Sequence, residues 1–349
     1  MKIGLVIYGS LDTLSGGYLY DRKLVEYLRT QGDSVEIISL PWRNYAAHLT
    51  DNFHFRLPKD LDILIEDELD HPSLIAANAG KHSYPVVSLV HHLRCSELRT
   101  AWQNTLYRLI EQKYLRSVDG FIFNSETTKK VVNGLLNNEK RSVLAYPPTD
   151  RFGEILSEEE IIERAKSPTL RILFVGNLIH RKGLHTLLEA LSILQPFSFS
   201  LDVVGSTTSD PAYAQAVKRK ASTTGPASNI HFHGSLDELP LIELLKQSHI
   251  LVVPSSYEGF GIVYLEGMGF GLPAIGTTAG AAGEIITHGV NGWLIQAEDA
   301  GTLAKFLSTL AADRNLLTKL SLNALRRYRE QPKWEQTAGR IRTFLQSMI

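Results

Sequence analysis

Short runs of apolar residues alternate along this chain with longer segments in which apolar residues recur every three or four positions. Short continuous apolar runs are typical of buried parallel strands, and the longer amphipathic segments are typical of the helices that join such strands. In the first half, strands are predicted at residues 3–8, 35–40, 63–66, 86–91, 120–123 and 143–146. Helices are predicted at residues 18–31, 73–79, 99–116 and 126–136.

The apolar pattern lapses after Pro147 and Pro148. Residues 154–168 are acidic and irregular, which predicts a linker and a domain boundary after residue 165. A second series follows, with strands predicted at 171–175, 200–204, 230–233, 250–253, 274–276 and 293–295. Its predicted helices are 184–194, 211–223, 239–247, 261–270, 300–311 and 315–328. Two such series predict an α/β fold with Rossmann-like domains at residues 1–165 and 166–331 that face each other across a cleft. Ligands of these sheets bind beyond the carboxyl ends of the strands.

The composition is that of an ordinary globular protein. Of 349 residues, 44% are hydrophobic and 21% charged, and 36 Lys and Arg balance 37 Asp and Glu, so no overall field attracts nucleic acid. Cys95 is the one cysteine, which excludes an intrachain disulfide and favours the reducing cytoplasm. No apolar stretch approaches the roughly 20 residues that span a bilayer. Residues 1–9 indicate a first strand rather than a signal peptide.

Residues 254–267 carry the most informative pattern, in which a predicted strand ends, a glycine-containing turn follows and a helix begins near Gly261. The first N–H groups of a helix are unpaired, and together with the helix dipole they bind anions such as phosphate. Glu258 lies in the turn, and Glu266 lies roughly 7–8 Å further along the helix axis. Two carboxylates so placed could hold hydroxyls at the two ends of an elongated polar ligand. The alternative is a helix with an acidic first turn and one solvated glutamate.

Three further positions follow strand ends. Arg181 and Lys182 precede a predicted helix and suit a clamp on a diphosphate, with an exposed basic turn as the alternative. Gly16 and Gly17 follow the first strand, where glycine lets the backbone approach a ligand, and they do not form the glycine fingerprint of a dinucleotide site. His91 ends the predicted strand 86–91. It forms no metal pair with the next histidine, because neighbouring strand residues point to opposite faces.

The helix predicted at 99–116 allows two interpretations. Trp102, Leu106 and Leu109 share one helix with the cations Arg99, Arg108, Lys113 and Arg116. The favoured interpretation is that the apolar residues face the core and the basic side is solvated. The alternative is a weak contact with an anionic membrane surface, where basic amphipathic helices bind.

The spacing of Glu258 and Glu266 resembles the E-x7-E signature of the family 4 retaining glycosyltransferases. That family has the GT-B fold, in which two Rossmann-like domains face each other and a C-terminal helix crosses back to the first domain. Residues 332–349 resemble this last helix. The resemblance implies an acceptor side at 1–165 and a nucleotide-sugar donor side at 166–331.

The resemblance also implies roles for individual residues. Glu258 contacts sugar hydroxyls next to the reacting carbon, and Glu266 holds the ribose. Lys182 matches the later of the family's two cations on the diphosphate. Asn177 stands where the family has the earlier arginine, and Arg181 is the candidate replacement. The remaining implied contacts come from paired glycines, backbone amides and the histidine near the sugar's primary hydroxyl: Gly16, Gly17, Phe260, Gly261, Ile262, Val263 and His91.

The predicted function is transfer of a hexose from a nucleotide sugar, UDP-glucose first and GDP-mannose second, to a hydroxyl of a glycan, small molecule or lipid head group. The configuration is retained, and Glu258, His91 and Lys182 are the expected catalytic residues. Neither a cofactor nor a metal is expected, since Asp60 and Asp62 precede their strand and lie at its amino end. The alternatives are a GT-B sugar-nucleotide epimerase and a non-catalytic nucleotide-sugar-binding subunit.

Overall fold

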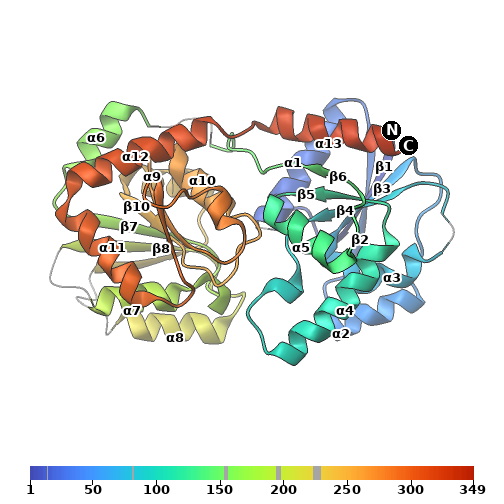
Figure 1. Cartoon of the computed structure of the whole chain (residues 1–349), viewed down its shortest axis with the longest axis horizontal. Helices are drawn as coiled ribbons and strands as arrows, with labels where there is room; N and C mark the ends of the chain where they lie inside the picture. Colours follow the sequence, from blue (N-terminus) through green and yellow to red (C-terminus); the bar gives the residue numbers. More distant parts are fainter. Residues whose placement is uncertain (14, 81, 153–155, 194–197, 223–228) are drawn as a thin grey trace. The chain divides into compact units, whose positions relative to one another are not determined.

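The computed structural model describes residues 1–13, 15–80, 82–152, 156–193, 198–222 and 229–349. Contacts divide the chain into two compact units, each with a parallel six-stranded sheet and helices packed on it (Figure 1). Unit 1 comprises Met1–Pro148 and Pro332–Ile349, and unit 2 comprises Thr149–Gln331.

The sheet of unit 1 has the strand order β2-β1-β3-β4-β5-β6. Its strands are β1 (Lys2–Tyr8), β2 (Ser34–Leu40), β3 (Ile63–Asp67), β4 (Val86–Val90), β5 (Gly120–Phe123) and β6 (Arg141–Leu144). Its helices are α1 (Gly16–Thr30), α2 (Tyr45–His48), α3 (His71–Asn78), α4 (Ala101–Ser117), α5 (Glu126–Leu136) and α13 (Trp334–Met348). Along β1, Leu5 and Ile7 join one hydrophobic cluster and Val6 and Tyr8 another, so this strand is buried on both faces.

The C-terminal helix α13 is part of unit 1. Ala338, Ile341 and Leu345 are spaced on one side of α13 and are buried in the cluster that also holds residues of β1 and α1. Arg342 Nε lies 2.7 Å from Asp33 Oδ2, and the amino group of Met1 lies 2.8 Å from Asp33 Oδ1. The two ends of the chain therefore meet at one buried carboxylate.

The sheet of unit 2 has the strand order β12-β11-β10-β7-β8-β9. Its strands are β7 (Leu170–Val175), β8 (Phe199–Val204), β9 (Ile230–Gly234), β10 (Ile250–Val252), β11 (Ala274–Thr277) and β12 (Gly292–Ile295). Its helices are α6 (Glu158–Ala165), α7 (Leu184–Ile193), α8 (Pro211–Ala221), α9 (Glu238–Gln247), α10 (Ile262–Gly269), α11 (Ala300–Ala312) and α12 (Arg314–Arg329). The chain runs from β7 outward to β9 and returns to β10 on the other side of β7. The neighbouring strands β7 and β10 thus form a topological switch point.

The predicted strands and helices are present, and most bounds differ by one or two residues. The segment 154–168, predicted to be irregular, is an exception, because it contains α6. Ser157 and Glu160 form a capping box at the start of α6, and Ile161 and Ala165 are buried. Because α6 packs on α12, the units divide after Pro148 and not after residue 165. The predictions for Glu154, Ile155, Leu194 and Thr223 lie outside the described residues.

The favoured interpretation of α4 is wrong. Trp102, Leu106 and Leu109 are 68%, 49% and 60% exposed, so they do not face the core. The buried residues of α4 are Glu111, Tyr114 and Leu115. Within the described part of the chain, no helix has both the length and the hydropathy needed to cross a membrane.

Candidate functional site

Two loops leave the sheet of unit 2 at its switch point. Residues 176–183 follow β7, and residues 253–261 follow β10. The two strands are parallel neighbours, with Ile172 paired to Ile250 and Leu173 paired to Leu251. Both loops therefore start at the same carboxyl edge, which brings the predicted cations of the first loop to the predicted glutamate of the second.

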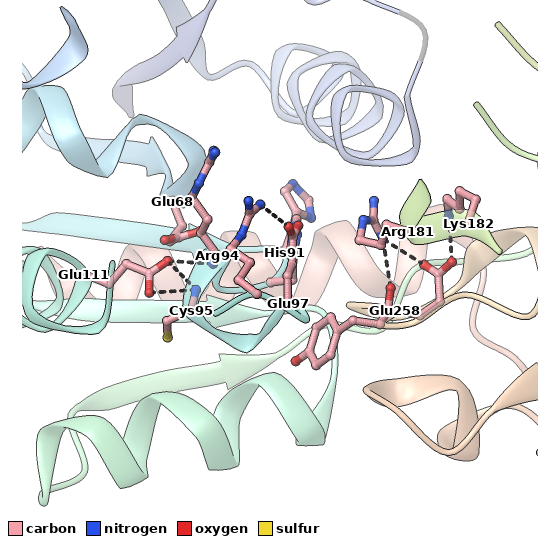
Figure 2. A network of polar contacts seen from close by, with 12 residues as sticks. Glu68, His91, Arg94, Cys95, Glu97, Glu111, Arg181, Lys182 and Glu258 are labelled. Carbon is pink, nitrogen blue, oxygen red and sulfur yellow. Dashed lines mark hydrogen bonds and ion pairs between the residues drawn. The ribbon is translucent and has the colours of Figure 1, made fainter. Parts of the chain in front are cut away.

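Glu258 is the centre of this cluster. Its carboxylate is buried, and Oε1 accepts hydrogen bonds from Lys182 Nζ and from Ser255 Oγ, both at 2.6 Å. Arg181 Nη1 lies 3.9 Å from Oε2 and donates to the carbonyl oxygen of Tyr257 at 2.8 Å. Figure 2 shows Glu258 between Arg181 and Lys182. Three predicted site residues thus meet in one polar network.

The electrostatics of the cluster favour ionised groups. Burial alone would raise the pKa of Glu258, but Lys182 and Arg181 lower it below its ordinary value. Burial lowers the pKa of Lys182, and the charge of Glu258 opposes that effect. One carboxylate stands against two cations, so the cluster carries an excess of positive charge. Such an excess at a strand end suits a ligand with phosphate groups.

Backbone contacts hold the Glu258 turn in place. Glu258 and Gly280 form an isolated parallel bridge, and the N–H of Ala281 donates to the carbonyl oxygen of Glu258 at 2.8 Å. Gly280 has φ +82°, and a Cβ there would lie 2.1 Å from that carbonyl oxygen. Only glycine allows this close approach, so the position of Glu258 depends on the residue facing it.

Helix α10 begins directly after this turn. Gly261 is its N-cap with φ +92°, Phe260 is buried, and Ile262 and Val263 open the first turn. The N–H groups of a first turn have no intrahelical acceptor. Tyr264 donates from its hydroxyl to the carbonyl oxygen of Val253 at 2.7 Å and so ties α10 to the end of β10.

Glu266 lies on α10, buried, with a partner that the sequence had not indicated. Arg151 Nη1 donates to Glu266 Oε1 at 2.6 Å. Burial raises the pKa of Glu266, and Arg151 opposes that rise. Arg151 follows the two prolines, where no periodicity pointed to a site. Asn177 lies in the loop after β7, and its carbonyl oxygen accepts from the N–H of Ile179 at 2.8 Å.

The predicted residues of unit 1 form a second group. Gly16 and Gly17 open α1, and the N-cap Ser15 accepts from the N–H of Tyr18. A Cβ on Gly17 would lie 3.3 Å from Cδ2 of His91, so the glycine turn and the histidine after β4 are neighbours. His91 Nε2 lies 3.1 Å from Oδ1 of Asp21, a fully buried residue of α1.

Buried acids around His91 control its charge. Burial would lower the pKa of His91, but Asp21, Asp67 and Glu68 raise it to about 9. Burial raises the pKa of Asp67 to about 7 and that of Glu68 to about 8. Sequence reasoning missed Asp21, although its spacing from Tyr18, Leu24 and Leu28 puts an acid on the apolar face of α1. The buried acids, Asp21 first, therefore favour the imidazolium form of His91.

Three clusters in the described part of the chain bring possible metal ligands within 4.8 Å of one another. Neither Glu258 nor Glu266 is among their members. The clusters are His180, His185 and Glu298; Asp21, Asp67 and His91; and Glu68, His71 and Glu111.

Comparison with known proteins gives a consistent result. A family model described as glycosyl transferases group 1 matches residues 157–327. An uncharacterized glycosyltransferase of Methanocaldococcus jannaschii is 25% identical, over 97% of this chain and 96% of its own length.

Two solved structures share the fold along the whole chain. Sucrose-phosphate synthase of Thermosynechococcus elongatus superposes with a TM-score of 0.82 at 18% identity, covering 99% of this chain and 98% of its own. HepE of Anabaena, in complex with UDP and glucose, superposes with a TM-score of 0.76 at 18% identity. The match covers 99% of this chain and 100% of the HepE chain. At this identity the likeness shows the fold alone.

Proposed function

Because this chain is a GT-B glycosyltransferase with a glycosyl transferases group 1 domain at residues 157–327, we propose that it transfers a hexose from a nucleotide sugar to a hydroxyl acceptor and retains the configuration. UDP-glucose is the first donor candidate and GDP-mannose the second. The complex of Anabaena HepE with UDP and glucose supports this order.

The observation that carries the proposal is the cluster of Arg181, Lys182 and Glu258 at the switch point of unit 2. We assign Arg181 and Lys182 to the donor's diphosphate, with Asn177 at the place of the family's earlier arginine. Glu258 contacts the sugar hydroxyls, and Glu266 holds the ribose. Backbone amides at the start of α10 contact sugar and phosphate, from Phe260, Gly261, Ile262 and Val263.

Loss of the nucleoside diphosphate leaves one positive charge on the sugar and adds one negative charge to the diphosphate, whose terminal phosphate then carries two. Arg181, Lys182 and the N-terminus of α10 stabilise those negative charges. The acceptor hydroxyl attacks from the face that the diphosphate leaves, and the departing phosphate takes its proton. We favour this route, which the family resemblance implies, over a double displacement through Glu258.

In unit 1 we assign His91 to the sugar's primary hydroxyl, to which an imidazolium donates a hydrogen bond. Gly17 lies beside His91, and we assign Gly16 and Gly17 to the donor phosphates or to the acceptor. The acceptor is a glycan, a small molecule or a lipid head group, and a weak contact with a membrane surface belongs to the last case. The single cysteine fits a reducing compartment, and we place the reaction in the cytoplasm.

The deciding experiment offers nucleotide sugars with and without a panel of hydroxyl acceptors. Release of nucleoside diphosphate that needs an acceptor, together with a product of the donor's own anomeric configuration by proton NMR, supports the proposal. Donor turnover without an acceptor would instead identify an epimerase. Tight binding of nucleoside diphosphate without any release from donor would identify a binding subunit. An inverted product would exclude retention.

A further inference from the structure

Helix α4 of unit 1 exposes an apolar face that the proposed transfer reaction does not use. Trp102, Leu106 and Leu109 are all exposed, and Leu98, just before the helix, is 65% exposed. The spacing of four and then three residues puts the three helical side chains on one face. Glu111, Tyr114 and Leu115 are buried on the opposite side, so the apolar face points away from the core of unit 1.

The same helix concentrates positive charge. Arg108, Lys113 and Arg116 are exposed on α4. Glu111 is the only acid of α4, and it is buried, where its carboxylate accepts from the backbone N–H groups of Arg94 and Cys95 (Figure 2). The exposed side of α4 therefore carries cations and no acid, although the whole chain has a net charge of −1.

We propose that α4 docks unit 1 on an anionic lipid surface. Trp102, Leu106 and Leu109 would enter the boundary between head groups and acyl chains, where apolar helix faces insert. Arg108, Lys113 and Arg116 have aliphatic stems long enough to keep their charges at the level of the head groups. Apolar burial and attraction to anionic lipid then act together.

The charge distribution favours lipid over a second copy of this chain. A two-fold interface places the same patch on both partners, so two copies of α4 would bring Arg108, Lys113 and Arg116 against the same cations. Like charges across an interface oppose association. Anionic head groups complement these cations instead.

Docking would present lipid head groups to the unit that we assign to the acceptor. That consequence rests on the proposed function, whereas docking itself is measured without donor, acceptor or turnover. Failure of vesicle binding and failure of hexose transfer are therefore separate results.

The experiment sediments the full chain with vesicles of phosphatidylcholine alone or with added phosphatidylglycerol. We expect binding to the anionic vesicles that falls with added salt. The affinity of the variant Trp102→Ser/Leu106→Ser/Leu109→Ser for these vesicles should fall at least about tenfold. The affinity of the variant Arg108→Gln/Lys113→Gln/Arg116→Gln should fall about fivefold for each cation removed.

The matched control Leu239→Ser/Ile193→Ser removes two exposed apolar side chains of unit 2, which are 76% and 54% exposed, and should bind as the unchanged chain does. All three variants change exposed residues, so their thermal unfolding should match that of the unchanged chain. Absence of binding to anionic vesicles, or equal binding by the two α4 variants and the unchanged chain, would overturn the proposal. So would a dimer of the unchanged chain that the apolar variant of α4 abolishes.

Discussion

Glu258 is the residue on which the proposed chemistry depends most. Glu258→Gln keeps the size of the side chain and removes the charge that faces Lys182 and Arg181. We expect turnover to fall about 100-fold, roughly 2.7 kcal/mol, while the affinity for free nucleoside diphosphate changes little. Steady-state kinetics and calorimetric binding of UDP and GDP measure the two effects. Glu243→Gln, at an exposed position of α9, is the control, and turnover within a few fold of that control would remove Glu258 from its role.

Glu266 should behave in the opposite way, since we assign it to the nucleotide. Glu266→Ala should weaken donor and free nucleoside diphosphate alike, by about 10- to 150-fold, because a hydrogen bond to a carboxylate contributes roughly 1.5–3 kcal/mol. The substitution also leaves Arg151 without its partner at 2.6 Å. Arg151→Gln is therefore measured beside it, to separate the loss of the carboxylate from the loss of the ion pair. An unchanged dissociation constant in folded Glu266→Ala would exclude the ribose contact.

His91 makes stability depend on pH in a defined direction. Its pKa of about 9 lies above that of an unfolded histidine, so its contribution to stability is present below about pH 6.5 and is lost as pH rises through about 9. The raised pKa values of Asp67 and Glu68 act in the same direction, because ionising a buried carboxyl opposes folding. We expect a lower melting temperature at pH 9 than at pH 6, and a smaller difference in Asp21→Asn. A melting temperature that rises over this range would contradict the charge assigned to His91.

Among the elements, the turn between β10 and α10 should be sensitive to a single methyl group. Gly280→Ala would place its Cβ 2.1 Å from the carbonyl oxygen of Glu258, at φ +82°. We expect turnover to fall more than tenfold and stability to fall by about 1–3 kcal/mol or more. Gly289→Ala is the matched control, since Gly289 has φ +77° but no atom within 4 Å of its Cβ. Equal effects of the two substitutions would show that backbone strain alone, and not the contact with Glu258, is responsible.

For the whole molecule, we expect transfer to need no divalent metal ion. The proposed diphosphate site offers Arg181, Lys182 and the start of α10, and another cation there would be repelled. The metal-ligand cluster of Asp21, Asp67 and His91 lies in unit 1 and shares no residue with that site. Transfer assayed in excess EDTA should proceed as in buffer alone. Complete loss of activity that returns with Mg²⁺ or Mn²⁺ would overturn the assignment of the diphosphate site.

The sequence by itself determined the elements and the fold class. Periodicity is a local property, and it placed α5 and β5 at their observed bounds. The α/β fold and its GT-B character, expected from the two series and from Glu258 and Glu266, are confirmed. The capping box at Ser157 was also a local signal for α6, but the acidic composition around it had been interpreted as a linker.

Only the tertiary structure decided the partners of the charged residues and the environment of each helix face. Arg151 and Glu266 are 115 positions apart, and Asp21 and His91 are 70 apart, so no local pattern pairs them. The same limit applies to α4. Its periodicity identified an apolar face, but whether such a face is buried depends on what packs against it. In α4, the side with Glu111, Tyr114 and Leu115 faces the core, while Trp102 is exposed. Burial is a property of the assembled fold, because it is set by neighbours that come from distant parts of the chain.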